Sequence, residues 1–173
     1  LRAAGQAAAL TPCSLLTWSA TDQLLTIRGV LRRSDVASLG RTLVSRGAPD
    51  NATRLEIQPF DGPYCDALEL FRPVLGAFGA APVATLQGQS PLASGERIRI
   101  AIEAPEWASH LYVGYLDTEG RIAHLITARA MRPRERLVLG ENETYTVGPP
   151  FGTDLVVVIA SEQPLFGPEP LSE

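Results

Sequence analysis

The sequence predicts an α+β protein: a small ββαβα module with one disulfide, followed by an antiparallel β-sandwich of about seven strands with an Ig-like arrangement. Three observations predict this division. Apolar residues recur at helical spacing in two stretches before residue 74, short strand-like runs dominate from residue 83 onward, and small residues fill the stretch 76–82 between them. We therefore expect one domain over 11–79 and a second over 83–166, with flexible ends at 1–10 and 167–173.

The composition indicates a folded protein and argues against a nucleic-acid binder. The chain has 173 residues, of which 45% are apolar and 20% charged, so it can build a packed core. A net charge of -4 argues against a nucleic-acid binder, which usually carries a basic stripe. All 15 basic residues are arginine. This bias reflects either a GC-rich genome or an arginine surface selected to recognise carboxylates or phosphates.

The first module begins with a predicted hairpin. Two apolar runs, 15–19 and 24–30, flank a short polar turn. Residues 34–35 then open a helix, which ends at Gly47. The apolar positions of this helix follow the helical period: Val36, Leu39, Leu43 and Val44.

A strand and a second helix complete the module. Residues 54–60 alternate polar and apolar side chains, as a half-buried strand does. After the turn at 61–62, a helix begins near Pro63, and Pro73 ends or kinks it. We expect the two helices to cover one face of a small sheet. The apolar residues of the second helix are Tyr64, Ala67, Leu68 and Phe71.

The two cysteines, Cys13 and Cys65, indicate the compartment. Neither belongs to a CxxC motif and no histidine is close in sequence, which argues against a metal site. As a pair they form one disulfide in an oxidising space, joining the start of the first strand to the start of the last helix. Closing the loop between residues 13 and 65 with a disulfide stabilises a chain by roughly 4 kcal/mol. The alternative is two buried free thiols in a cytosolic protein.

The chain is expected to be part of something longer. Its only methionine is Met131, which predicts that a preceding segment, such as a signal peptide or an anchor, has been removed. The alanine-rich residues 1–10 are then the tail of a linker that follows a membrane anchor, or a stretch without a structural role. No run approaches the roughly 18 apolar residues that a membrane helix needs.

The second domain is predicted to be nearly all β. Residues 117–120 and 140–142 are turn signals. The strand at 97–103 alternates charged and apolar residues, which is typical of a sheet with one solvated face. The run at 155–159 does not alternate and is expected to be a central strand covered on both sides. The predicted strands are 83–86, 97–103, 110–116, 121–124, 135–139, 143–147 and 155–159.

The candidate binding residues are aromatic and arginine side chains of this domain. Trp107 lies in a loop, either as a partly exposed anchor for an interface or a sugar ring, or as a cap on the core. Tyr112 and Tyr115 fall on opposite faces of one strand, so one of them should be exposed. Arginines around Pro133 meet an acidic partner, an anionic polymer or lipid head groups, or form a solvated loop. These arginines are Arg129, Arg132, Arg134 and Arg136.

The sequence predicts no cofactor, metal site or catalytic residue. His110 and His124 fall on consecutive strands, but a metal would need further ligands such as Asp117 or Glu119. A nucleophilic cysteine would need a histidine from the other domain, and a disulfide would consume its thiol. Neither a Gly-x-Ser-x-Gly motif nor a glycine-rich phosphate loop occurs. An enzyme with an unrecognised site is the alternative.

Two family resemblances cover nearly the whole chain. The stretch from Pro12-Cys13 through 24–30 to 61–65, with Arg72-Pro73, resembles a BON-like module. In that family setting, such a module often follows the transmembrane segment of a bacterial serine/threonine protein kinase.

The second domain carries several separated motifs in order. They are the run Leu-Tyr-Val-Gly-Tyr-Leu-Asp-Thr-Glu-Gly at 111–120, His124-Leu125, Pro-Phe-Gly-Thr-Asp at 150–154, and Ala-Ser-x-x-Pro-Leu-Phe at 160–166. Together they resemble a bacterial domain family of unknown function that accompanies kinase-like, caspase-like and secretion-associated proteins. The resemblance implies extracytoplasmic sensing or assembly.

These resemblances imply a non-catalytic region of a bacterial envelope protein. The expected location is the periplasm or another extracytoplasmic space, with the full-length protein anchored to the inner membrane. The expected partner is a protein of the cell envelope, and the alternative is peptidoglycan or another glycan. No nucleic-acid partner is expected. Attachment to a membrane is expected only through a segment that is absent from this chain.

Overall fold

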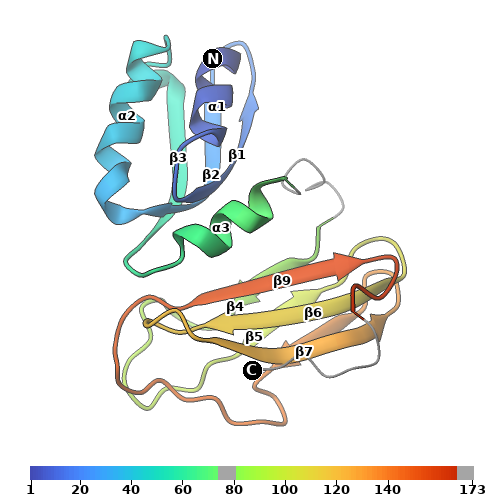
Figure 1. Ribbon diagram of the computed structural model, residues 1–173. Helices are drawn as coiled ribbons and strands as arrows, with labels where there is room; N and C mark the ends of the chain where they lie inside the picture. Colours follow the sequence, from blue (N-terminus) through green and yellow to red (C-terminus); the bar gives the residue numbers. More distant parts are fainter. Residues whose placement is uncertain (74–80, 167–173) are drawn as a thin grey trace. The chain divides into compact units, whose positions relative to one another are not determined.

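The computed structural model describes residues 1–73 and 81–166. The chain divides into two compact units, Leu1–Gly76 and Ala77–Glu173 (Figure 1). Each has its own apolar core. The predicted class, a small α+β module followed by a β-sandwich, is confirmed. Most of the predicted linker at 76–82 and the predicted flexible end at 167–173 lie outside the described residues.

The first unit contains a three-stranded sheet of order β1-β2-β3. β1 and β2 form the predicted antiparallel hairpin, whereas β2 and β3 run parallel, so the chain crosses between them through a helix. Short 3-10 turns at Arg33–Asp35 and Asp50–Ala52 flank that helix. The elements are α1 (Arg2–Ala9), β1 (Ser14–Ala20), β2 (Leu25–Arg32), α2 (Val36–Ser45), β3 (Thr53–Phe60) and α3 (Cys65–Phe71).

The expectation that residues 1–10 are flexible is wrong, because Arg2–Ala9 form α1. Ala4 and Ala8 lie one turn apart on the same helix face, and both are 0% exposed. Gly5 lies directly against the indole ring of Trp18, so that even a β-carbon at this position would collide with the ring. Small side chains therefore let the backbone of α1 approach the sheet closely.

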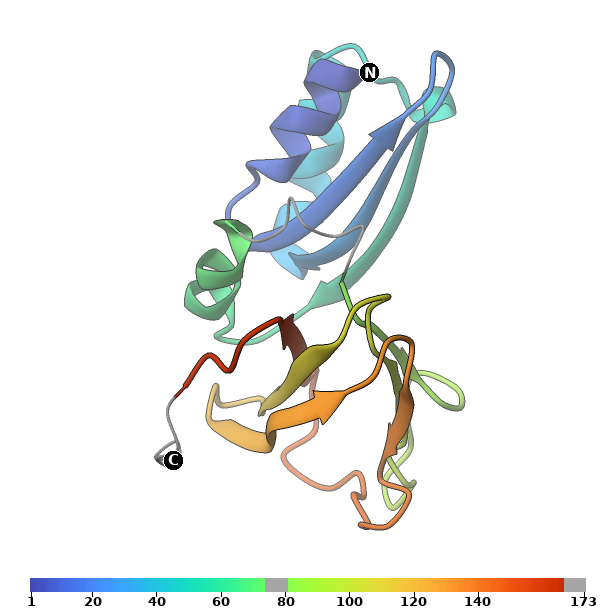
Figure 2. The ribbon, with the colours of Figure 1, turned by 90° about the vertical axis from the view of Figure 1, so that its right-hand side faces the viewer.

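The helices that cover the sheet are α1 and α2 rather than the predicted pair α2 and α3. α1 and α2 lie on one face of the sheet, and α3 lies at its end, beside the start of β1 (Figures 1 and 2). The alanine face of α1 takes the place expected for α3. The core between helices and sheet consists of Ala4, Ala8, Leu16, Leu25, Ile27, Leu31, Leu39, Leu43 and Ala48.

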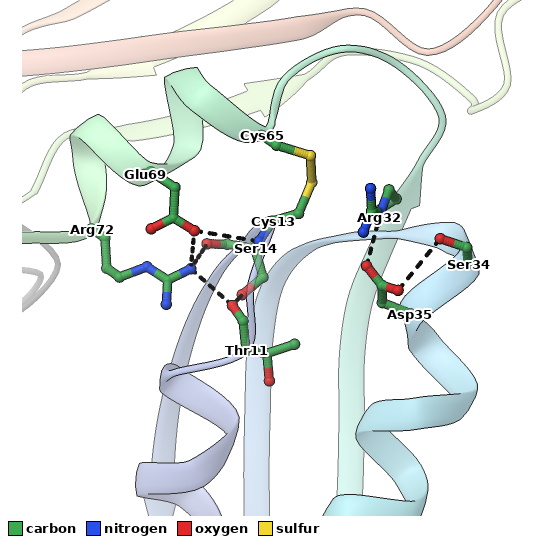
Figure 3. A network of polar contacts seen from close by, with 9 residues as sticks. All are labelled: Thr11, Cys13, Ser14, Arg32, Ser34, Asp35, Cys65, Glu69 and Arg72. Atoms are coloured by element: carbon green, nitrogen blue, oxygen red, sulfur yellow. Dashed lines mark hydrogen bonds and ion pairs between the residues drawn. A yellow bond between two sulfur atoms is a disulfide. The ribbon is translucent and has the colours of Figure 1, made fainter.

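The predicted disulfide between Cys13 and Cys65 is confirmed. Their Cα atoms are 4.4 Å apart, and the bond joins the residue before β1 to the first residue of α3. Beside it, Arg72 Nη2 donates to the carbonyl oxygen of Thr11 at 2.8 Å and pairs with Glu69 Oε1 at 2.7 Å (Figure 3). The disulfide and these contacts fasten α3 to the start of β1.

The second unit is an antiparallel sandwich of two three-stranded sheets, β4-β5-β8 and β7-β6-β9. The strands are β4 (Val83–Leu86), β5 (Ile100–Glu103), β6 (Ser109–Leu116), β7 (Ile122–Met131), β8 (Arg136–Leu139) and β9 (Leu155–Ser161). Its core is built from residues of both sheets and from Ala104, which follows β5: Ile100, Ile102, Ala104, Leu111, Val113, Met131 and Leu137.

The predicted strand at 143–147 does not form, and the described sandwich has six strands instead of about seven. The segment makes one isolated bridge, between Arg97 and Thr146, and the carbonyl oxygen of Tyr145 accepts a hydrogen bond from Ile98 N at 2.8 Å. Its side chains stay largely exposed, so a longer ladder would bury little apolar surface. For the same reason the predicted strand at 97–103 begins only at Ile100.

The expectation that 155–159 is a central strand is also wrong. Within the described residues β9 pairs with β6 alone and is half-buried along its length, and the central strand of its sheet is β6. An apolar run without alternation indicates that both faces meet other groups. It does not indicate how many strands lie on either side.

β7 extends well beyond the predicted strand at 121–124 and ends at Met131. It has 10 residues against 8 in β6, and two register shifts in their pairing, on either side of Val113, accommodate the difference. Ala128, with a φ of +53°, lies beside the first shift. Such bulges bend a strand and are not visible in its apolar pattern.

Candidate binding site

Two loops meet at one end of the second unit. One connects β5 to β6, and the other connects β7 to β8. Ala104 N donates to the carbonyl oxygen of Glu135 at 2.8 Å, and Arg134 N donates to that of Pro105 at 2.8 Å. These bonds join residues 103–108 and 132–136 into one structure, which we call the loop corner.

A tight turn shapes the arginine side of the loop corner. Glu135 N donates to the carbonyl oxygen of Arg132 at 3.0 Å. Pro133 follows Arg132, and Arg134 has a φ of +55°, as in a type II turn, where glycine is usual. An arginine in this left-handed region costs about 1 kcal/mol. Its ion pair with Glu106 and its backbone bond across the corner offset that cost.

The predicted arginine cluster is largely neutralised by carboxylates. Three of its members lie in ion pairs: Arg132 with Glu135, Arg134 with Glu106, and Arg136 with Glu103. Hydrogen bonds from the backbone amide of Arg132, and next from its side chain, hold the pKa of Glu135 below its usual value. Arg129 is exposed and has no ion pair with any described residue. The loop corner therefore presents alternating charges and not a uniform basic patch.

Trp107 belongs to the same loop corner. It follows Glu106 in the loop between β5 and β6, and its side chain is half-buried. The sequence did not connect Trp107 with the arginines, because they are distant in the chain. The hydrogen bonds between the two loops bring them to one end of the sandwich.

Tyr112 and Tyr115 lie on opposite faces of β6 as predicted, but neither is fully exposed. Tyr112 is buried: its hydroxyl accepts a hydrogen bond from Leu165 N at 2.8 Å, and its ring meets that of Phe166 edge-on at 5.6 Å. The hydroxyl of Tyr115 donates to Asp154 Oδ2 at 2.7 Å. The two tyrosines thus fasten the segments on either side of β9 to β6.

We expect Tyr115→Phe to lower the unfolding free energy of the second unit by about 1 kcal/mol, because the hydrogen bond to the Asp154 carboxylate is lost. Chemical denaturation measures the effect. Tyr145→Phe is the matched control, since its hydroxyl donates to Glu143, a near neighbour in the chain. Equal stabilities of wild type and Tyr115→Phe would contradict a fastening role.

The predicted family motifs at 111–120 and 150–154 lie against each other. Besides the bond from Tyr115 to Asp154, a β-carbon at Gly152 would collide with the side chain of Thr118 in the hairpin turn. The segment before β9 therefore packs on the turn that follows β6. These motif residues have structural roles at the hairpin end of the sheet.

Asp117 organises that hairpin turn. Its carboxylate accepts hydrogen bonds from the backbone amides of Glu119 and Arg121, both at 2.9 Å, and from Arg121 Nε at 2.7 Å. Burial raises the pKa of Asp117, but the bonds from Arg121 and from the backbone outweigh it, so this pKa lies below its usual value.

The pKa of Asp117 predicts the acid sensitivity of the hairpin. Because the folded pKa is lower than the unfolded value of about 3.9, the stabilisation is present above that pH and is lost as the pH falls through the folded pKa. We expect Arg121→Gln to raise the pKa of Asp117 in an NMR titration, whereas Arg129→Gln leaves it unchanged. An unchanged pKa in Arg121→Gln would show that the pair does not hold the carboxylate.

The two histidines lie far apart. His110 lies opposite Ala130, and His124 lies opposite Gly114, so they are offset along β6 by about 13 Å. In residues 1–73 and 81–166, no three His, Cys, Asp or Glu side chains are grouped so that they could hold a metal ion. Both cysteine thiols are consumed by the disulfide.

Part of the second unit matches a known protein family. Residues 92–164 match a family described as a domain of unknown function, DUF4384. No curated protein matches the chain. No solved structure matches it either.

Proposed function

We propose that this chain is a non-catalytic, extracytoplasmic protein-recognition or sensor region of a bacterial envelope protein, attached to a kinase or to a secretion system. The disulfide between Cys13 and Cys65 supports the location, because disulfides persist in oxidising compartments. Among the described residues, no helix has the length and apolar content needed to cross a bilayer. The attachment rests on the resemblances of the two modules.

The loop corner carries the proposal of recognition. It presents a half-buried tryptophan beside three arginine–carboxylate pairs, on two loops that hydrogen bonds hold in place. Tryptophan and arginine are enriched among the residues that dominate binding energy at protein interfaces. Loops held in one conformation also lose little entropy on binding.

We expect Trp107→Ala to weaken the crosslinking of the chain to its protein partner in a bacterial envelope extract by roughly tenfold, because an aromatic anchor is removed. Leu70→Ala is the control, since Leu70 is an exposed large apolar side chain of the first unit. Quantitative mass spectrometry of the crosslinked products measures the difference. Equal crosslinking of the two variants would refute recognition through the loop corner.

The second candidate function is binding of peptidoglycan or another glycan. The partly exposed indole of Trp107 favours it, because aromatic rings stack on sugar faces and leave a polar edge in water. Sedimentation with purified peptidoglycan tests it. Retention of the wild type and loss of Trp107→Ala would support the glycan, and no retention of the wild type would exclude it.

A further inference from the structure

One edge of the sheet in the first unit is open. β3 is the last strand in the order β1-β2-β3, and among the described residues it pairs with β2 alone (Figure 2). Most of its side chains are exposed. Its free side therefore presents a row of backbone N–H and C=O groups to which another strand can pair.

Pro59 indicates which residues of β3 turn their backbone groups toward this open edge. Proline has no N–H, so within a sheet its nitrogen faces the free side of an edge strand. The backbone groups of alternate residues in a strand point to the same side. Thr53, Leu55 and Ile57 alternate in step with Pro59 and therefore present their N–H and C=O groups at the open edge.

The strand carries opposite charges on the face of the sheet that the helices do not cover. Ile57 packs against the core beneath the helices, so Arg54 and Glu56, which alternate with it, lie on the other face. Arg54 forms no ion pair with any described residue. Glu56 pairs with Arg28 of β2 through Oε2, and within the described chain its Oε1 remains available to a second arginine.

Apolar surface borders the open edge on the helix-covered face. A hollow of about 280 Å³ lies between β3 and α2, and Leu55 lines it while remaining 42% exposed. On α2, Val44 lies one turn after Gly40 of the hollow and is 53% exposed. A strand paired with β3 would therefore remove apolar surface from water in addition to satisfying backbone groups. The residues that line the hollow are Gly40, Leu43, Ala48, Asp50, Thr53 and Leu55.

The sequence of β3 is complementary to itself in one antiparallel register. When two copies pair about a two-fold axis at Leu55, each Arg54 lies opposite Glu56 of the other copy, and each Thr53 lies opposite Ile57. The pairs of Leu55 with Leu55 and of Thr53 with Ile57 then exchange about six backbone hydrogen bonds in all. The pairs of Arg54 with Glu56 fall at the positions without backbone bonds, where opposing side chains are closest.

The charges distinguish this register from its neighbours. Moving the axis by one residue, to Arg54 or to Glu56, keeps the same backbone groups at the interface but places two arginines or two carboxylates opposite each other. Like charges directly opposite each other are destabilising. Pairing about Leu55 is the register in which both charged residues of each copy meet an opposite charge.

We propose that the chain forms a symmetric dimer in which β3 pairs with β3 of a second copy and joins the two sheets into one. The match between Arg54 and Glu56 identifies a second copy as the occupant of the edge, because it arises when the strand pairs with itself. The two Leu55 side chains lie side by side over the hollows. Edge pairing buries little surface, which predicts a weak dimer with a dissociation constant on the order of micromolar.

Sedimentation equilibrium of the full chain over a range of concentrations tests the proposal. We expect a monomer–dimer equilibrium that Arg54→Glu and Glu56→Arg each weaken roughly tenfold, because like charges then lie opposite each other. An equimolar mixture of these two variants should dimerise again, since every charged pair of the mixed dimer joins a carboxylate to an arginine. Arg2→Glu is the matched control, because Arg2 is an exposed arginine of α1, which packs against β1 at the other edge of the sheet.

Leu55→Pro provides a second variant that adds no charge. Proline removes one N–H from the open edge and leaves the ladder with β2 intact, as Pro59 does, so circular dichroism should show a retained fold while dimerisation is lost. The proposal is overturned if the wild type stays monomeric at its highest soluble concentration, or if the charge variants or Leu55→Pro dimerise as the wild type does. Failure of the mixture to dimerise, or equal weakening by Arg2→Glu, would likewise overturn it.

The dimer and the recognition role of the loop corner fail separately. Trp107→Ala should dimerise as the wild type does, because Trp107 belongs to the second unit and β3 to the first. A monomeric wild type whose envelope crosslinking is sensitive to Trp107→Ala would refute only the dimer. A dimer that responds to Arg54→Glu, with crosslinking unchanged in Trp107→Ala, would refute only the loop corner.

Discussion

Replacing Gly29 with alanine is expected to destabilise the first unit by about 4 kcal/mol or more, a rare magnitude for one methyl group. Gly29 has a φ of +134°, a region that L side chains rarely adopt. Its β-carbon would also collide with the carbonyl oxygen of Leu15 on the neighbouring strand β1. Because that oxygen belongs to the backbone, relief requires a shift of the β1–β2 ladder.

Gly40→Ala is the control for this substitution. Gly40 lies inside α2, and apart from its chain neighbours and the helix's own backbone no atom of the described residues lies within 4 Å of a β-carbon built there. We expect this variant to gain about 0.5–1 kcal/mol, because alanine loses less backbone entropy than glycine in a helix. Chemical denaturation of both variants measures the contrast. Wild-type stability in Gly29→Ala would show that β1 and β2 do not approach closely at this point.

Removing the disulfide is expected to lower the stability of the first unit by roughly 2–5 kcal/mol. The bond closes a loop with a sequence separation of 52 and fastens α3, a helix of 7 residues that is too short to be stable alone. The double variant Cys13→Ala/Cys65→Ala should show this loss in chemical denaturation. Hydrogen exchange should place the loss of protection in α3 and at the start of β1.

A reductant provides the matched comparison. It should destabilise the wild type to the level of the double variant and leave the double variant unchanged. Mass spectrometry should detect alkylation of Cys13 and Cys65 only after reduction. Alkylation of both residues without reductant, or equal stability of the oxidised and reduced wild type, would contradict a structural disulfide.

Much of the first unit could be predicted from local patterns. The spacing of Val36, Leu39 and Leu43 located α2 to within a residue or two, because an amphipathic helix must repeat its apolar positions. The alternation at 54–60 located β3 in the same way. The disulfide was predicted over the alternative of two free thiols, and the structure confirms it.

The failures have a common cause in packing. α1 was missed because alanines carry a weak apolar signal, and their value lies in letting the helix approach Trp18 and the sheet. The strand at 143–147 was predicted from its place among short strand-like runs, yet its side chains stay largely exposed. The run in β9 was placed at the centre of its sheet, although the number of its neighbours depends on β6 and β7.

For the candidate site too, the sequence identified the residue types, and the structure decided how they are arranged. Trp107, the two tyrosines and the arginines were all found as residue types suited to binding. Only the structure separated them: Tyr112 and Tyr115 hold the flanks of β9, whereas Trp107 and three of the four arginines meet in the loop corner.

The sequence by itself determined the α+β class and the positions of most strands and helices, because these follow from local periodicity. It favoured pairing of the two cysteines over free thiols, and the structure decided for the disulfide. The tertiary structure decided that α1 belongs to the core, that β6 is the central strand, and which aromatic side chains remain available. These features depend on hydrogen bonds and packing between residues distant in the chain, and such contacts have no local pattern from which they can be predicted.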